Sequence, residues 1–277
     1  MTEVRADPLH RLRARVARLG APLCLGIDPH PDSLPDELPR DVRGIETFAR
    51  GLVEAASEHA AAVKVNVAFF EAFGSPGWAA LERLVADLPP DQFLVLDAKR
   101  GDIGSTAERY ATSLFGLLGG DAVTLSPYLG EDAVEPFLEY SGRVVYLVTR
   151  TTNPSAGTLQ DLHLGSAPLH EHVATWAAGR WTDGRVGLVV GATAPAELAR
   201  VRRLVPALGF LVPGVGAQDG DLAAALAHCH GTAAPGLVSI SRGIAAASRG
   251  DGWRAAAAAS AQAWLGRMQE ASATLPA

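Results

Sequence analysis

The chain has 277 residues, of which 48% are hydrophobic, and its formal net charge is −6. This length suits one large domain or two small ones, and the apolar fraction is sufficient for a sizeable core. The acidic balance excludes a global basic field that would attract nucleic acid or an anionic membrane, so an anionic substrate must be held by a local site.

The cysteines and the first residues of the chain predict its compartment. Two cysteines, Cys24 and Cys229, do not make a disulfide framework and suit a reducing environment. Charged residues occur throughout positions 1–19, unlike the apolar region of a signal peptide, and no uninterrupted run of about 18 apolar residues occurs anywhere. We therefore expect a cytoplasmic protein with neither nucleic acid nor a membrane as a partner.

Apolar segments of strand length alternate with helical patterns along the chain. The expected strands are 23–28, 62–67, 93–98, 121–126, 143–148, 186–190, 208–212 and 236–241. The expected helices are 8–19, 41–59, 78–87, one that starts at the capping-box spacing of Ser105 and Glu108, then 131–140, 167–179, 195–205, 219–228 and 251–270. Most of the strands are continuous apolar runs, which is typical of parallel strands covered on both faces.

Two architectures fit this alternation, a doubly wound sheet and a (β/α)8 barrel. The eight expected strands, the total length and the polar residues at the strand ends favour the barrel, and no GxGxxG motif follows the first strand. We predict an α/β fold, a (β/α)8 TIM barrel that occupies residues 1–277 as a single domain. A helical segment over 1–20 would precede the barrel and a loose tail would occupy 271–277.

The third expected strand ends in a group of charged residues. Asp97 and Lys99 are two positions apart and so emerge on the same face of the strand. Asp102 follows a turn at Gly101 and could return to this pair or reach a neighbouring subunit. A carboxylate–ammonium–carboxylate cluster is costly to bury unless function needs it, and the alternative is a surface ion pair at a strand end.

Polar residues follow most of the other strands, at what would be the active-site end of a barrel. They are Asp28, Lys64, Asn66, the segment 126–128, the segment 149–154, the segment 213–218 and the segment 239–243. The last two segments suggest a phosphate site, because Gly214 and Gly216 let backbone N–H groups approach an anion. Arg242 and Gln218 would add side-chain donors. An ordinary tight turn is the alternative explanation of the two glycines.

Lysines and aspartates that alternate at one site indicate a reaction that builds negative charge on carbon. Flanking carboxylates keep an ammonium group protonated, so Lys99 should be a poor amine nucleophile, which argues against a Schiff-base aldolase. It suits instead the stabilisation of a developing carbanion and the delivery of a proton to it. An opposite charge at about 4 Å is worth a few kcal/mol at an effective dielectric constant of ~20.

Several motifs resemble those of one known family. The segment Asp97-Ala-Lys99-Arg-Gly-Asp102-Ile103 is similar to the D-x-K-x-x-D-I signature of the orotidine 5′-phosphate decarboxylases. The motifs that resemble the second, longer type of this family are Gly26-Ile-Asp28-Pro, Lys64-Val-Asn66-Val-Ala-Phe-Phe-Glu71, Thr151-Thr-Asn-Pro154 and Pro213-Gly-Val-Gly-Ala-Gln218. The resemblance extends from about residue 21 to residue 245.

The resemblance implies a role for each residue of the charged group. Lys99 would donate the proton to C6 and be the main cationic stabiliser. Lys64, Asp97 and Asp102 would complete a Lys-Asp-Lys-Asp array around the substrate carboxylate. In this family the second aspartate and a nearby threonine come from the partner subunit. Asp102, Ile103 and Thr106 would therefore reach across the interface of a homodimer with shared active sites.

The resemblance also implies which residues bind the rest of the substrate. Asp28 would hold a ribose hydroxyl, and Asn66 would also bind the substrate. Thr152, or else Thr151, would form a hydrogen bond with the pyrimidine. The donors to the 5′-phosphate would be Gln218, Arg242 and the Gly243 amide.

The activity implied by the resemblance is decarboxylation of orotidine 5′-monophosphate to UMP and CO₂, without a metal and without a cofactor. One alternative is an Mg²⁺-dependent sugar-phosphate decarboxylase or hexulose-phosphate synthase with the same D-x-K-x-x-D barrel. Another is a non-catalytic nucleotide-binding barrel. Two departures stand out: the family often has Thr-Ser where this chain has Thr151-Thr152, and Asp219 stands where a second glycine is expected after Gln218.

Two histidine-containing triplets could suggest a metal site. His228-Cys229-His230 and His170-Glu171-His172 each place adjacent residues on a helix, where they point in different directions. We therefore expect no metal at either triplet, with the first at a helix end and the second facing solvent.

Overall fold

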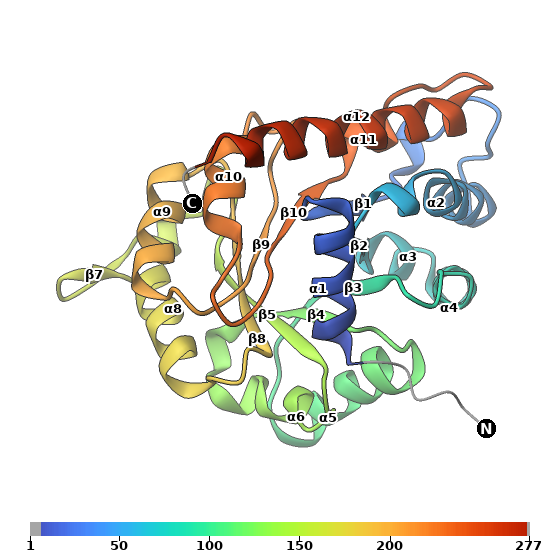
Figure 1. Cartoon of the computed structure of the whole chain (residues 1–277). Helices are drawn as coiled ribbons and strands as arrows, with labels where there is room; N and C mark the ends of the chain where they lie inside the picture. Colours follow the sequence, from blue (N-terminus) through green and yellow to red (C-terminus); the bar gives the residue numbers. More distant parts are fainter. Residues whose placement is uncertain (1–6, 276–277) are drawn as a thin grey trace.

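Parallel strands form the centre of the fold. The structure is a computed structural model, and it describes residues 7–275. Eight strands within this range close into a barrel in sequence order (Figure 1). They are β1 (Leu23–Ile27), β2 (Ala62–Asn66), β3 (Phe93–Arg100), β4 (Ala122–Leu125), β5 (Val144–Arg150), β8 (Val186–Val190), β9 (Phe210–Val212) and β10 (Leu237–Ile240). The predicted (β/α)8 barrel is confirmed.

Helices surround this barrel and cover the outer faces of its strands. The longer ones are α1 (Pro8–Leu19), α2 (Val42–Ala56), α4 (Gly74–Ala86), α5 (Gly104–Ala111), α8 (Leu169–Arg180), α9 (Pro195–Leu204), α10 (Leu222–Cys229) and α12 (Trp253–Ala273). The short ones are α3 (Ala68–Glu71), α6 (Glu135–Leu138), α7 (Gly157–Gln160) and α11 (Arg242–Ala245). Among the described residues, no helix combines the length and the apolar character that crossing a bilayer requires.

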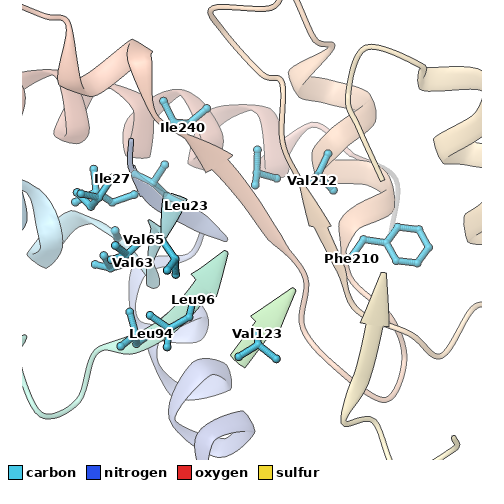
Figure 2. Close-up of a cluster of buried hydrophobic side chains, with 14 of the residues drawn as sticks. Leu23, Ile27, Val63, Val65, Leu94, Leu96, Val123, Phe210, Val212 and Ile240 are labelled. Carbon is cyan, nitrogen blue, oxygen red and sulfur yellow. The ribbon is translucent and has the colours of Figure 1, made fainter. Parts of the chain in front are cut away.

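Alternate strand residues face two different apolar layers, as expected from the two-residue period of a strand. Figure 2 shows part of the outer layer, where strand side chains such as Leu23, Val63 and Leu94 pack towards the helices. The inner layer fills the barrel and contains Cys24, Ala62, Phe93, Val95, Ala122, Val144, Tyr146, Val189, Leu211 and Leu237. Leu9 and Leu12 of α1 join this inner layer, so α1 closes the end of the barrel where the strands begin (Figure 1).

A buried ion pair fixes α1 to this end of the barrel. Arg11 Nη2 lies 2.5 Å from Asp121 Oδ1, and the Asp121 side chain is fully buried. The other carboxylate oxygen of Asp121 accepts a hydrogen bond from the Leu94 amide at 3.0 Å. With this end closed, the polar residues that follow the strands surround an opening at the opposite end.

The structure corrects several predicted boundaries. The predicted capping box is wrong, because α5 begins at Gly104 with Ile103 at its N-cap and no side-chain cap, which places Ser105 and Glu108 inside the helix. The segment 131–140 forms a short 3₁₀ turn and then α6, because Pro136 favours the first turn of a new helix.

Two further differences between the predicted and the observed elements lie in the C-terminal half of the chain. A small antiparallel hairpin, β6 (His163–Leu164) and β7 (Ala167–Pro168), was not predicted and projects from the barrel (Figure 1). The last helix, α12, continues to Ala273 and so includes the beginning of the predicted tail; residues 276–277 of that tail lie outside the described residues.

Candidate active site

Two lysines and two aspartates meet where β1, β2 and β3 end. Lys64 Nζ lies 3.0 Å from Asp97 Oδ2 and 3.3 Å from Asp28 Oδ1. Lys99 Nζ lies 2.5 Å from Asp97 Oδ1. Asp97 therefore bridges both ammonium groups, and these are the chain's two lysines, since its other Lys/Arg residues are all arginines.

The register of the strands explains why these side chains meet. Lys64 pairs with Val95 and Asn66 pairs with Asp97 across the β2–β3 ladder. Val95 belongs to the layer inside the barrel, and Asp97, two residues further along β3, faces the same way. The predicted alternation along the third strand thus places its charges inside the barrel mouth.

Thr124 on β4 completes the arrangement and was not predicted as a site residue. Its hydroxyl donates a hydrogen bond to Asp97 Oδ1 at 2.8 Å and accepts one from the Lys99 amide at 3.0 Å. Its signal in the sequence is a single polar residue within an apolar strand. Because Thr124 holds both neighbours, it fixes the Asp97 carboxylate and the backbone that carries Lys99.

The backbone of Lys99 is in the left-handed region, with φ of 46°. Such a conformation costs a non-glycine residue about 1–3 kcal/mol and persists only where the surroundings hold it. Two contacts stabilise this conformation here: the hydrogen bond from the Lys99 amide to Thr124 and the contact of the Lys99 ammonium with Asp97. The Lys99 side chain is 51% exposed, so its ammonium can meet a molecule entering the barrel mouth.

Burial and charge oppose each other at Asp97 and Lys64. Burial alone would raise the pKa of Asp97, but the ammonium groups of Lys64 and Lys99 outweigh it and hold that pKa well below its ordinary value. Burial alone would lower the pKa of Lys64, but Asp28 and Asp97 outweigh it and raise that pKa above its ordinary value. The aspartate therefore stays anionic and the buried lysine cationic around neutral pH.

Asp102 does not join this cluster within its own chain. Its carboxylate accepts a hydrogen bond from the Ile103 amide at 2.8 Å, and no ion pair between residues 7 and 275 links it to either lysine. Ile103 is 52% exposed and Thr106 is also exposed. Of the three residues predicted to cross a subunit interface, Ile103 and Thr106 are thus exposed and Asp102 is half-buried.

A cavity of about 410 Å³ opens next to the charged cluster. Asp28, Asn66 and Arg242, all predicted site residues, line it together with the aromatic side chains of Phe48 and Phe69. Phe69 was not singled out, although it belongs to the motif that begins at Lys64. The cavity therefore combines an acid, an amide, a guanidinium and apolar walls, which suits a polar ligand with a flat or apolar part.

The loops after β5 and β9 approach each other on the other side of the mouth. A Cβ built on Gly214 would lie 2.9 Å from Thr152 Cγ2 and 3.0 Å from Gln218 Oε1. Gly214 has φ of 98°, so both its conformation and these close neighbours require glycine. The side chains of Thr152 and Gln218 therefore both lie beside Gly214.

The two adjacent threonines differ in their hydrogen bonding. The Thr151 hydroxyl donates to Asn153 Oδ1 at 2.5 Å and accepts from Gln160 Nε2 at 2.9 Å. No hydrogen bond within residues 7–275 uses the Thr152 hydroxyl. Thr152, rather than Thr151, therefore has a hydroxyl available to a ligand.

Asp219 is exposed in the loop after β9, with φ of 57°. The helix expected from residue 219 begins instead at Leu222, because Asp221 caps it by accepting a hydrogen bond from the Ala224 amide at 2.9 Å. The Asp219 carboxylate is thus not part of the helix start.

The two histidine-containing triplets differ from each other in the structure. Cys229 ends α10 and is buried, as expected for a helix end. The prediction that the second triplet faces solvent is wrong for two of its members, because His170 and Glu171 are each only 3% exposed. Partners from other segments hold them there: Glu171 pairs with Arg200, and His170 lies against Asp161. No group of three or more metal-binding side chains is assembled among the described residues.

The part of the chain that contains all of these site residues matches a known protein family. Residues 21–258 match the family model described as "Orotidine 5′-phosphate decarboxylase / HUMPS family". A protein of Roseiflexus castenholzii named orotidine 5′-phosphate decarboxylase is 51% identical over 243 residues, which are 87% of this chain and 89% of that relative. One of Herpetosiphon aurantiacus with the same name is 44% identical over 93% of this chain and 96% of its own length.

Solved structures agree with this match. The OMP decarboxylase of Leishmania donovani has a TM-score of 0.85 and 38% identity, covering 97% of this chain and all of that one. The UMP synthase of the same organism has a TM-score of 0.85 and 40% identity over 96% of this chain. The present chain corresponds to 57% of that longer protein.

Proposed function

This chain belongs to the orotidine 5′-phosphate decarboxylase / HUMPS family and is a decarboxylase of UMP biosynthesis, and we propose that it forms UMP through a C6 carbanion that Lys99 stabilises and protonates. The observation that carries this proposal is the chain of charges Lys64–Asp97–Lys99 at the barrel mouth. It provides a fixed cation where a reaction would build negative charge on carbon.

The reaction that we propose balances without another reactant. The bond between C6 and the carboxylate of orotidine 5′-monophosphate breaks, CO₂ leaves, and the electron pair stays on C6. Lys99 Nζ then gives a proton to C6 and takes another from solvent. A cation about 4 Å from the developing charge is worth about 4 kcal/mol at an effective dielectric constant of ~20, which corresponds to about a thousandfold in rate.

We assign the rest of the substrate to the surrounding side chains. Asp28, with Asn66 beside it, holds the ribose, because both line the cavity next to Lys64. Thr152 binds the pyrimidine, because its hydroxyl is available. Gln218, Arg242 and the Gly243 amide hold the 5′-phosphate at the ends of β9 and β10.

We also propose a homodimer with shared sites. The support is that the half-buried Asp102 makes no contact with its own lysines, while Ile103 and Thr106 next to it are exposed. Mixing the inactive variants Lys99→Ala and Asp102→Ala tests this assignment, because hybrid dimers would contain one intact site. Recovery of activity on mixing is expected, and its absence after subunit exchange has been verified would contradict shared sites.

We place the activity in the cytoplasm. Both cysteines are free and buried, which suits a reducing compartment. Fractionation of the source cells, with the activity recovered in the cytosolic fraction, is the expected result, and recovery in an extracellular fraction would contradict it.

The proposed reaction is tested by the loss of ultraviolet absorbance of orotidine 5′-monophosphate, with and without EDTA, and by identification of UMP as the product. Turnover that EDTA does not change is expected. Activity abolished by EDTA and restored by Mg²⁺ would favour a metal-dependent sugar-phosphate enzyme. Binding of UMP by a folded protein without turnover would favour a non-catalytic barrel, and either result would overturn the proposal.

A further inference from the structure

One glutamine holds the segment that follows β5. Gln160, the last residue of α7, accepts a hydrogen bond from the Thr151 amide through Oε1 at 2.9 Å. Its Nε2 donates to the Thr151 hydroxyl at 2.9 Å. One side-chain amide therefore binds both the backbone and the side chain of Thr151.

Gln160 and the residue after it are themselves fixed by neighbouring side chains. Its carbonyl accepts a hydrogen bond from Nδ1 of His170 at 2.9 Å, and the His170 side chain is only 3% exposed. The next residue, Asp161, binds the Arg150 guanidinium through two hydrogen bonds of 2.9 and 3.0 Å. Arg150 ends β5, so the C-terminal end of α7 is tied to the barrel at Arg150 as well as at Thr151.

These contacts determine which threonine faces the barrel mouth. With the Thr151 hydroxyl bound to Gln160 and Asn153, the side chain of Thr152 packs against the glycines that follow the next two strands. A Cβ built on Gly191 would collide with the Thr152 methyl group, and one on Gly214 would lie 2.9 Å from it. Thr152 is thus confined to one orientation between these two glycines.

We propose that Gln160 is a positioning residue for recognition of the pyrimidine base, which acts by holding Thr151 outward so that Thr152 points to the ligand. This inference rests on the proposed function, because it assigns the Thr152 hydroxyl to the base. In this proposal Gln160 acts on the ligand only through Thr151 and Thr152.

The test compares two ligands that share the phosphate and ribose and differ in the base. Binding of UMP and of ribose 5-phosphate is measured by calorimetry on the wild type, Gln160→Ala and Gln160→Glu. Gln160→Ala should weaken UMP about tenfold, the effect of losing one or two hydrogen bonds, and leave ribose 5-phosphate within twofold. Gln160→Glu, which keeps the acceptor for the Thr151 amide and loses the donor to the hydroxyl, should be intermediate.

The matched control is Gln269→Ala, which removes a glutamine hydrogen bond to the Leu19 carbonyl on the far helix α12 and should alter neither ligand. In turnover, Gln160→Ala should raise KM about tenfold with little change in kcat. Unchanged UMP affinity in Gln160→Ala, or equal weakening of both ligands, would overturn the proposal.

Turnover and binding separate this inference from the proposed function. A wild type that binds UMP without decarboxylating its substrate would refute the function, while the Gln160 comparison would still be decided by binding. A wild type that does not bind UMP would refute both.

Discussion

Replacing Asp97 with asparagine removes the one negative charge that contacts both lysines. Lys64 Nζ and Asp97 Oδ2 are 3.0 Å apart, with side chains only 7% and 9% exposed. At an effective dielectric constant of ~20 their attraction amounts to about 5–6 kcal/mol. Lys64 would keep only the Asp28 contact at 3.3 Å. Since breaking a buried pair typically costs about 3–5 kcal/mol, Asp97→Asn should lower the free energy of unfolding by that amount at pH 7.

The pH dependence gives this prediction a second test. The pKa of Asp97 in the folded protein is below its ordinary value of 3.8, so its stabilisation is complete above that value and is lost as the pH falls through the folded value. The difference between wild type and Asp97→Asn in urea unfolding should therefore be constant near neutrality and shrink in acid.

The control for Asp97→Asn is Glu131→Gln, which breaks an exposed ion pair with Arg180 and should change stability little. A loss of less than about 1 kcal/mol in Asp97→Asn, or a difference from wild type that does not shrink in acid, would refute the electrostatic account of the cluster.

Three further predictions concern the lysines and the cysteines. Lys64→Met should be less stable than wild type by an amount that is constant at neutral pH. This difference should shrink only as the pH rises above the ordinary lysine pKa of 10.5, because the folded pKa of Lys64 is higher still. A stability difference that is lost near neutrality in urea unfolding would contradict this. Reductive methylation, followed by peptide mass spectrometry, should modify the 51% exposed side chain of Lys99 before the 7% exposed side chain of Lys64. The modification of Lys99 should abolish activity, and UMP should protect against it. Faster labelling of Lys64 would disprove the assigned burial. Cys24 and Cys229 should resist a thiol reagent at about pH 8 until urea is added, because burial raises the pKa of each thiol to about 12. Rapid reaction of the native protein would instead show that these thiols are accessible.

The barrel and its charged centre were predictable because both depend on local periodicity. Continuous apolar strands indicated a parallel sheet, and the two-residue period of a strand placed Asp97 and Lys99 on one face. The same reasoning could have identified Thr124, a polar residue whose position within β4 makes it face the barrel interior. It was missed because no charge or motif drew attention to it.

Contacts between distant segments were not predictable in this way. His170 and Glu171 appeared to be surface residues because their helix pattern contains no sign of Asp161 or Arg200, whose side chains pair with them. The hairpin of β6 and β7 has strands of two residues each, too short for any alternation to be visible. The role of Gln160 depends on a hydrogen bond between residues nine positions apart, which no motif indicated.

The most direct test of the central claim is single-turnover decarboxylation by Lys99→Ala, with UMP binding measured on the same sample. The account predicts a loss of at least about a thousandfold in rate, with UMP still bound because Asp28, Thr152 and Arg242 are unchanged, and partial recovery on addition of a small alkylammonium ion. A Lys99→Ala variant that binds UMP and decarboxylates within tenfold of the wild-type rate would contradict the assignment of Lys99 as the group that stabilises and protonates the carbanion.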